Sequence, residues 1–192
     1  MIKRLSMLMA IVGLSFLMSG CGAAKLTPEV AKTFQEKAVM YTQTNMHYNV
    51  YKSAYIIDTT NYQIGTLIPV NSEVIMQEVN AKQLTFLYKG QTITLRNIAK
   101  YSGLNISDVT SKYFSTKKVD LSKFSKAEQK AIGSASLVKG MSKEAVLLSL
   151  GTPPQHRTPD LNADTWTYWR NRWTTFIVSF EEGKVVSDHY IK

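Results

Sequence analysis

The sequence predicts an α+β protein in which a small β-rich domain, residues 50–118, precedes a domain of two helices and a three-stranded antiparallel sheet, residues 119–192. Three observations predict this fold class. Short runs of alternating apolar and polar residues, separated by turn residues, fill the middle of the chain. Two segments with helix-capping residues follow. Three strand-like segments then end the chain. The apolar content of 44% is sufficient for a packed core.

The first 20 residues read as a targeting segment. Lys3 and Arg4 provide its positive start, and the apolar run that follows is too short to span a membrane comfortably. We therefore predict a signal peptide over residues 1–20. Its end, Leu17-Met-Ser-Gly-Cys21, resembles a bacterial lipobox. The alternative is an ordinary secretory signal beside a chance cysteine.

Cys21 is the only cysteine in the chain, so it cannot form an internal disulfide. The lipobox resemblance implies that its sulfur carries a diacylglyceryl group and that its new amino end is acylated. Several acyl chains make a stable membrane anchor. Gly22, in place of an aspartate, implies passage to the outer membrane of a Gram-negative bacterium, with the protein facing the periplasm.

Residues 21–49 are predicted to form a tether and a helix. Thr27 is a good N-cap, and Pro28 suits the first turn. Apolar residues then recur at helical spacing, which carries the predicted helix to about Asn45; they are Val30, Phe34, Ala38 and Tyr41.

The predicted β-rich domain contains strand-like runs at 51–57, 84–89 and 92–95, with a turn at Gly90. Short strands joined by tight turns are typical of a curled antiparallel sheet, and we expect a barrel that resembles bacterial SH3 domains. A helix is predicted over residues 104–114.

The C-terminal domain begins with two helices. The run Ser125-Lys-Ala-Glu128 fits a capping box for the first one. Ser142 caps the second, and Met141 and Val146 can form a hydrophobic staple around that cap. Gly151 is expected in the left-handed conformation that ends the helix, and Pro153 prevents its continuation. Three strands are predicted after these helices, at residues 165–170, 173–180 and 184–191.

The same segment resembles the SmpA/OmlA (BamE-like) family of outer-membrane lipoproteins over residues 120–192. The motif residues that carry the resemblance are Gly140, Met141, Ser142, Val146, Leu150, Gly151, Pro153, Trp166 and Tyr168. The resemblance implies two helices packed on a three-stranded antiparallel sheet. It also implies a non-enzymatic scaffold that supports outer-membrane β-barrel assembly or envelope integrity. The short family members carry a polar, extended contact segment before the first helix, and residues 117–124 offer nothing like it.

A search for catalytic residues gives a negative result. His47, His156 and His189 are far apart in the sequence and lack the spacing of metal ligands. The Ser142 hydroxyl is assigned to a helix cap, and no phosphate loop or nucleophile motif occurs. The net charge of +9 comes from scattered lysines, without a nucleic-acid motif. We therefore predict no enzyme activity, cofactor, metal, nucleic acid or small-molecule substrate.

The aromatic strands indicate a binding surface instead. Trp166 and Tyr168 alternate with Trp169, so they lie on opposite faces of the sheet. Two helices can cover one face only, which leaves the second face either to the N-terminal domain or to a partner. Tryptophan and arginine are frequent interface anchors. The predicted contact residues for an envelope protein are Trp169, Arg170, Arg172 and Trp173.

Two other functions remain open from the sequence. The β-rich domain can be a reader of cell wall or peptide in the periplasm. Alternatively, the two-helix, three-strand architecture resembles that of β-lactamase-inhibitory proteins, although fold analogy alone says little about function.

Overall fold

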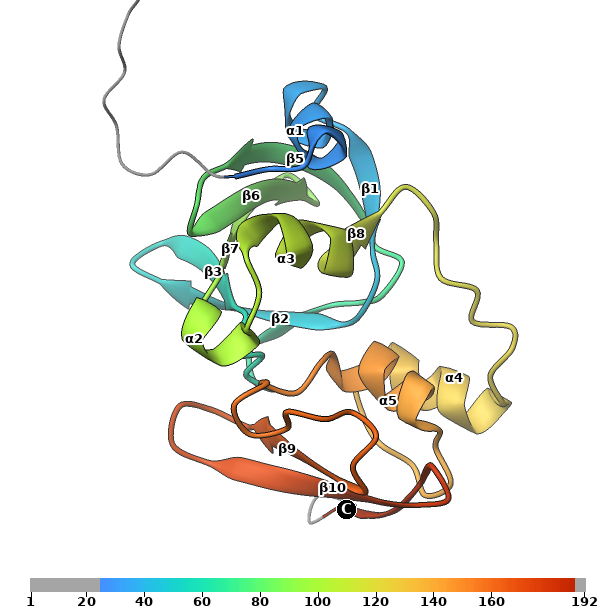
Figure 1. Cartoon of the computed structure of the whole chain (residues 1–192). Coiled ribbons are helices and arrows are strands. Elements are labelled where there is room, and N and C mark those ends of the chain that lie inside the picture. Colours follow the sequence, from blue (N-terminus) through green and yellow to red (C-terminus); the bar gives the residue numbers. More distant parts are fainter. Residues whose placement is uncertain (1–24, 189–192) are drawn as a thin grey trace, which may run out of the picture.

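The computed structural model describes residues 25–188, and it is an α+β fold with two sheets (Figure 1). The helices are α1 (Pro28–Gln35), α2 (Ala99–Ser102), α3 (Ile106–Tyr113), α4 (Lys126–Gly133) and α5 (Lys143–Leu150). The strands are β1 (Val39–Thr42), β2 (Met46–Tyr51), β3 (Ala54–Asp58), β4 (Thr66–Ile68), β5 (Glu73–Val79), β6 (Gln83–Tyr88), β7 (Gln91–Arg96), β8 (Phe114–Ser115), β9 (Thr165–Trp169), β10 (Thr175–Glu181) and β11 (Lys184–Asp188).

Strands β1 to β8 form one curled sheet in the order β4-β2-β3-β7-β6-β5-β1-β8 (Figure 1). The strand pairs are antiparallel except for β3 and β7, which run parallel. Helices α1 and α3 pack against this sheet and against each other. Apolar side chains that alternate along the strands fill the space between these layers, including Phe86 and Phe114, whose ring centroids are 5.1 Å apart. We call residues 25–118 the N-terminal unit.

The first helix is shorter than predicted. It begins at the Thr27 cap and Pro28 as expected, but it ends at Gln35 and not near Asn45. Lys37 has a positive φ of 47°, and the chain then enters β1. Met40 and Thr42 are buried along β1, so a period of two replaces the helical period. The β-rich region therefore starts at Val39, and the predicted start at residue 50 is wrong.

The C-terminal unit, residues 119–188, contains α4, α5 and a three-stranded antiparallel sheet in the order β11-β10-β9. Helices α4 and α5 lie between this sheet and the N-terminal unit (Figure 1). The turn between β10 and β11 has positive φ at both Glu182 and Gly183, which is the geometry of a type I′ hairpin. The motif residues Met141, Val146, Leu150, Trp166 and Tyr168 are all buried in one apolar cluster.

One carboxylate caps both helices of this unit. The predicted capping box at Ser125 and Glu128 is confirmed, and Ser142 caps α5 as predicted. Glu128 Oε2 accepts from the backbone N–H and hydroxyl of Ser125, and Oε1 accepts from the same two groups of Ser142, both at 2.8 Å. Burial alone raises the pKa of Glu128, but these hydrogen bonds outweigh it and lower the pKa to about 2.

The C-terminus of α5 differs from the prediction. Gly151 does have a positive φ of 73°, but its ψ of −175° is not the left-handed helical conformation. The last carbonyls of α5 therefore do not receive hydrogen bonds from a left-handed C-terminal turn of the helix itself. Instead, the carbonyls of Leu147 to Leu150 accept hydrogen bonds from the N-terminal unit. The donors are Thr44, Asn45, Asn61 and Gln63.

Asn45 is the centre of this seam between the two units. Its side chain is 2% exposed, and its Nδ2 donates to the carbonyls of Ile132, at 2.6 Å, and Ser149, at 3.0 Å. Its Oδ1 accepts from the backbone N–H of Val70 at 2.7 Å. Val70 itself belongs to the apolar cluster of the C-terminal unit. Because helix carbonyls at a buried C-terminus need partners, the two units complete each other's hydrogen bonding.

Candidate functional site

The inner face of the C-terminal sheet is a packed core. Trp166 pairs with Val178 across the β9–β10 ladder, and Tyr168 pairs with Phe176, so these four side chains share the face toward the helices. The Tyr168 hydroxyl donates to the Gly151 carbonyl at 2.9 Å, and burial raises its pKa well above the ordinary value. Trp166 and Tyr168 therefore stabilise the unit and are closed to a ligand.

Trp169, on the opposite face, is half-buried. Its ring is stacked with His156 at a centroid distance of 6.4 Å, and the Arg157 guanidinium lies 5.4 Å from its centroid. Tyr101 of α2 extends the stack, 4.5 Å from His156. Burial and the positive charge of Arg157 lower the pKa of His156, so this imidazole is neutral at pH 7. The predicted contact residue Trp169 is thus covered in part by the loop after α5.

The turn between β9 and β10 exposes the other three predicted contact residues, Arg170, Arg172 and Trp173. Asn171 shapes the turn, because its Oδ1 accepts from the backbone N–H groups of Trp173, at 2.8 Å, and Thr174, at 3.0 Å. Trp173 is 79% exposed, and the Arg172 guanidinium lies 4.5 Å from its ring centroid. A large aromatic side chain and a cation are therefore presented together to solvent.

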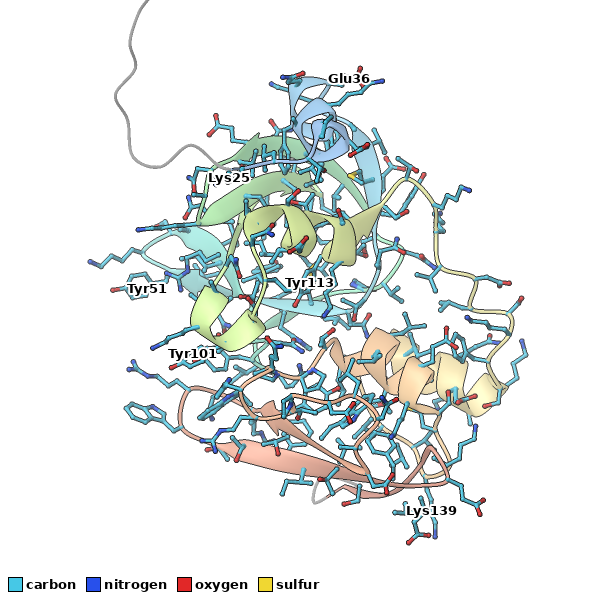
Figure 2. All side chains as sticks on the ribbon, viewed as in Figure 1. Lys25, Glu36, Tyr51, Tyr101, Tyr113 and Lys139 are labelled. Carbon is cyan, nitrogen blue, oxygen red and sulfur yellow. The ribbon has the colours of Figure 1, made fainter. Side chains whose placement is uncertain are left out.

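A groove of about 310 Å³ lies beside this turn. It runs between the outer face of the β2–β3 hairpin, the loop after β3 and the β9–β10 turn, so it joins the two units. We call it the seam groove; its lining residues are His47, Asn49, Tyr51, Ile56, Asp58, Tyr62, Arg96 and Arg172. Tyr51 and Tyr101 point outward on the same side of the molecule, where the β9–β10 turn also lies (Figure 2).

The groove contains one internal ion pair. Arg96 Nε and Nη2 donate to the two oxygens of Asp58 at 2.7 and 2.8 Å, which is a bidentate geometry. These hydrogen bonds raise the pKa of Arg96. His47 is half-buried, and burial lowers its pKa, so it is a neutral donor and acceptor at pH 7. Arg172 is the groove cation that has no ion-pair partner among the described side chains.

The backbone edges of the C-terminal sheet are already used. The N–H of Gln63 donates to the Trp169 carbonyl, and the Thr158 hydroxyl accepts from the N–H of Thr167. At the other edge, Val185 exchanges backbone hydrogen bonds with Gly140 and Met141. This sheet is therefore suited to contact through the side chains of its outer face and turn, and not to pairing with an added strand.

Sequence patterns predicted the contact residues of the turn but not the groove beside it. Its signal is visible in β2, where His47, Asn49 and Tyr51 alternate with residues of the other face. The partner side of the groove comes from Arg172, more than one hundred residues later. No local pattern connects these two segments.

Other predicted features lie at separate places. His47 lies in the seam groove and His156 on Trp169, while His189 lies outside the described residues. Among the described side chains of residues 25–186, no group of histidine, cysteine and carboxylate residues could hold a metal ion. Cys21 and the predicted signal peptide also lie outside the described residues.

The helices of the described chain are all too short or too polar to cross a membrane. Comparison of the whole chain with protein-family models, with curated proteins and with solved structures found no match.

Proposed function

We propose that this protein is an outer-membrane lipoprotein, anchored through Cys21, that acts as a non-enzymatic scaffold in the cell envelope. Its C-terminal unit would be an SmpA/OmlA (BamE-like) domain that docks onto another envelope protein. The process it serves would be assembly of outer-membrane β-barrel proteins or maintenance of envelope integrity. The lipid anchor would hold the protein at the periplasmic side of the membrane.

The observation that carries the proposal is the β9–β10 turn. Trp173 is 79% exposed there, with the Arg172 guanidinium 4.5 Å from its ring centroid. Exposed tryptophan is costly to leave in water, and tryptophan and arginine dominate the binding energy of protein interfaces. Ile177, which is 41% exposed, continues the apolar surface onto the outer face of β10.

The resemblance of residues 120–192 to the family is the second support. The order of two helices and three antiparallel strands agrees with the fold that the family motif implies. The motif residues Gly140 and Gly151 both have positive φ, as glycines that end or connect helices often do. The lipobox-like sequence before Cys21 supports the anchor independently.

Affinity purification tests this function. The lipidated protein, purified from its own envelope under mild detergent, should retain a discrete envelope protein. Trp173→Ala should reduce that capture about tenfold or more, as expected for loss of a central anchor. Thr175→Ala, at an exposed residue that begins β10, is the control. Equal capture by wild type and Trp173→Ala would reject the turn as the docking site.

A further inference from the structure

We propose that the seam groove binds an acidic segment of the protein partner, and that Arg172 pairs with its carboxylate. This inference rests on the proposed function, because it names the chemistry of the partner at the same surface. The groove proposal involves other residues than the proposed docking at the turn. The proposed function depends on the exposed indole of Trp173, whereas the groove is built mainly by the N-terminal unit.

The charge balance of the groove selects an anion. Its lining contains one carboxylate, Asp58, and that carboxylate is engaged on both oxygens by Arg96. Among the side chains that the structure describes, those of residues 25–186, Arg172 forms no salt bridge. Its guanidinium carbon lies 4.5 Å from the centroid of the Trp173 ring, and a cation over a ring face makes this contact without using an N–H group as a donor to an oxygen. A guanidinium presented in this way suits bidentate pairing with a carboxylate.

Arg96 can add to this recognition. Asp58 occupies two of its nitrogens, and a guanidinium carries five N–H donors in total. The ion pair also holds the Arg96 side chain in place on the groove wall. Binding of a ligand therefore costs less conformational entropy of Arg96. A second acidic group of the ligand can therefore accept from Arg96 without breaking the pair.

The walls of the groove suit an extended peptide segment. Tyr51, which is 62% exposed, Tyr62 and Ile56 supply aromatic and apolar contact area. The Nδ2 of Asn49 donates to the Ile64 carbonyl at 3.1 Å, and the side-chain oxygen Oδ1 of Asn49 is suited to accept a hydrogen bond from a ligand. The volume of about 310 Å³ matches a few residues of chain and is small for a folded surface.

A defined peptide pair tests the chemistry. The probe is a fluorescently labelled, amidated Glu-Tyr-Glu-Tyr-Glu peptide, and its control replaces every Glu with Gln. We expect saturable binding of the acidic peptide by the full chain without its signal peptide. Arg172→Gln should weaken this binding about tenfold, the effect of losing one well-placed charge partner. Asp58→Asn should strengthen it several-fold, because it removes the one negative charge that lines the groove.

Lys139→Gln is the matched control, since it removes one positive charge from an exposed site remote from Tyr51 (Figure 2). It should change the affinity less than twofold, because distant surface charges are screened by salt. Equal losses in Arg172→Gln and Lys139→Gln, equal binding of the Gln peptide, or binding only to phosphatidylglycerol vesicles would overturn the proposal. If partner capture still depends on Trp173 while the peptide does not bind, the proposed function stands and only the groove assignment fails.

Discussion

Asn45→Ala should destabilise the C-terminal unit, although Asn45 belongs to the N-terminal unit. The side chain makes three buried hydrogen bonds, to the carbonyls of Ile132 and Ser149 and from the N–H of Val70. Alanine removes the side-chain partner of all three groups, but the Ile132 carbonyl still accepts from the Ala135 N–H at 3.2 Å. The three backbone groups are left in a site where the native side chain is only 2% exposed.

The expected magnitude follows from these contacts. A buried group that loses its partner costs about 1–3 kcal/mol. The Val70 N–H and the Ser149 carbonyl lose their partner and the Ile132 carbonyl loses one of two, so after partial relaxation we expect a loss of roughly 3–4 kcal/mol. With a urea m-value of roughly 2 kcal/mol/M, the unfolding midpoint should fall by about 1.5–2 M.

The tryptophans make the assay specific. All three, Trp166, Trp169 and Trp173, lie in the C-terminal unit, so their fluorescence reports that unit alone. Urea unfolding of residues 21–192 should therefore show the shift by tryptophan fluorescence and by far-UV circular dichroism together. Asn162→Ala, an exposed asparagine in the loop before β9, should change stability by less than about 0.5 kcal/mol. An unchanged midpoint in Asn45→Ala, or a fluorescence transition separate from the dichroism transition, would refute the coupling of the two units.

Three further predictions test other parts of the structure. Gly151→Val should cost about 1–3 kcal/mol in urea unfolding of the same chain, because φ is positive and a Cβ would lie 2.9 Å from Asn61 Nδ2; an unchanged midpoint would contradict this geometry. Glu128→Gln should cost about 2 kcal/mol at pH 7. The ionised Glu128 side chain stabilises the fold fully above its ordinary pKa of 4.5, and this stabilisation is lost as the pH falls toward the folded pKa of about 2. The free energies of unfolding of wild type and Glu128→Gln should therefore converge near pH 2. A difference between them that does not change with pH would exclude this linkage. Mass spectrometry of the mature protein should find a lipidated Cys21 at the N-terminus, and Cys21→Ala should release the protein from membranes; an unmodified Cys21 would end the anchor hypothesis.

Local signals in the sequence predicted the C-terminal elements well. Ser125, Glu128 and Ser142 act as the caps that their spacing indicated, because capping depends on residues within one helical turn. The alternation of Trp166 and Tyr168 with Trp169 likewise predicted which side chains are buried. Such patterns are set by the period of the element and need no knowledge of the rest of the chain.

The seam could not be predicted in the same way. The sequence indicated that Gly151 ends α5, but nothing near it shows that the last carbonyls are satisfied by Thr44, Asn45 and Asn61. These contacts join residues about 90 to 104 positions apart. The first helix is shorter than predicted for the same reason. Tyr41 fits the helical spacing of the apolar residues before it, and only its pairing with β5, a strand about 30 residues later, shows that it lies in a strand.

Site-specific photocrosslinking can show whether the β9–β10 turn contacts a protein in the cell envelope. A photoreactive phenylalanine analogue in place of Thr174, an exposed residue of that turn, should crosslink the lipidated protein to a discrete envelope protein in intact cells. The same analogue in place of Lys139, which is exposed elsewhere on the C-terminal unit, should give no such product. Equal products from both positions, or products with lipid alone from Thr174, would contradict docking of a protein at this turn.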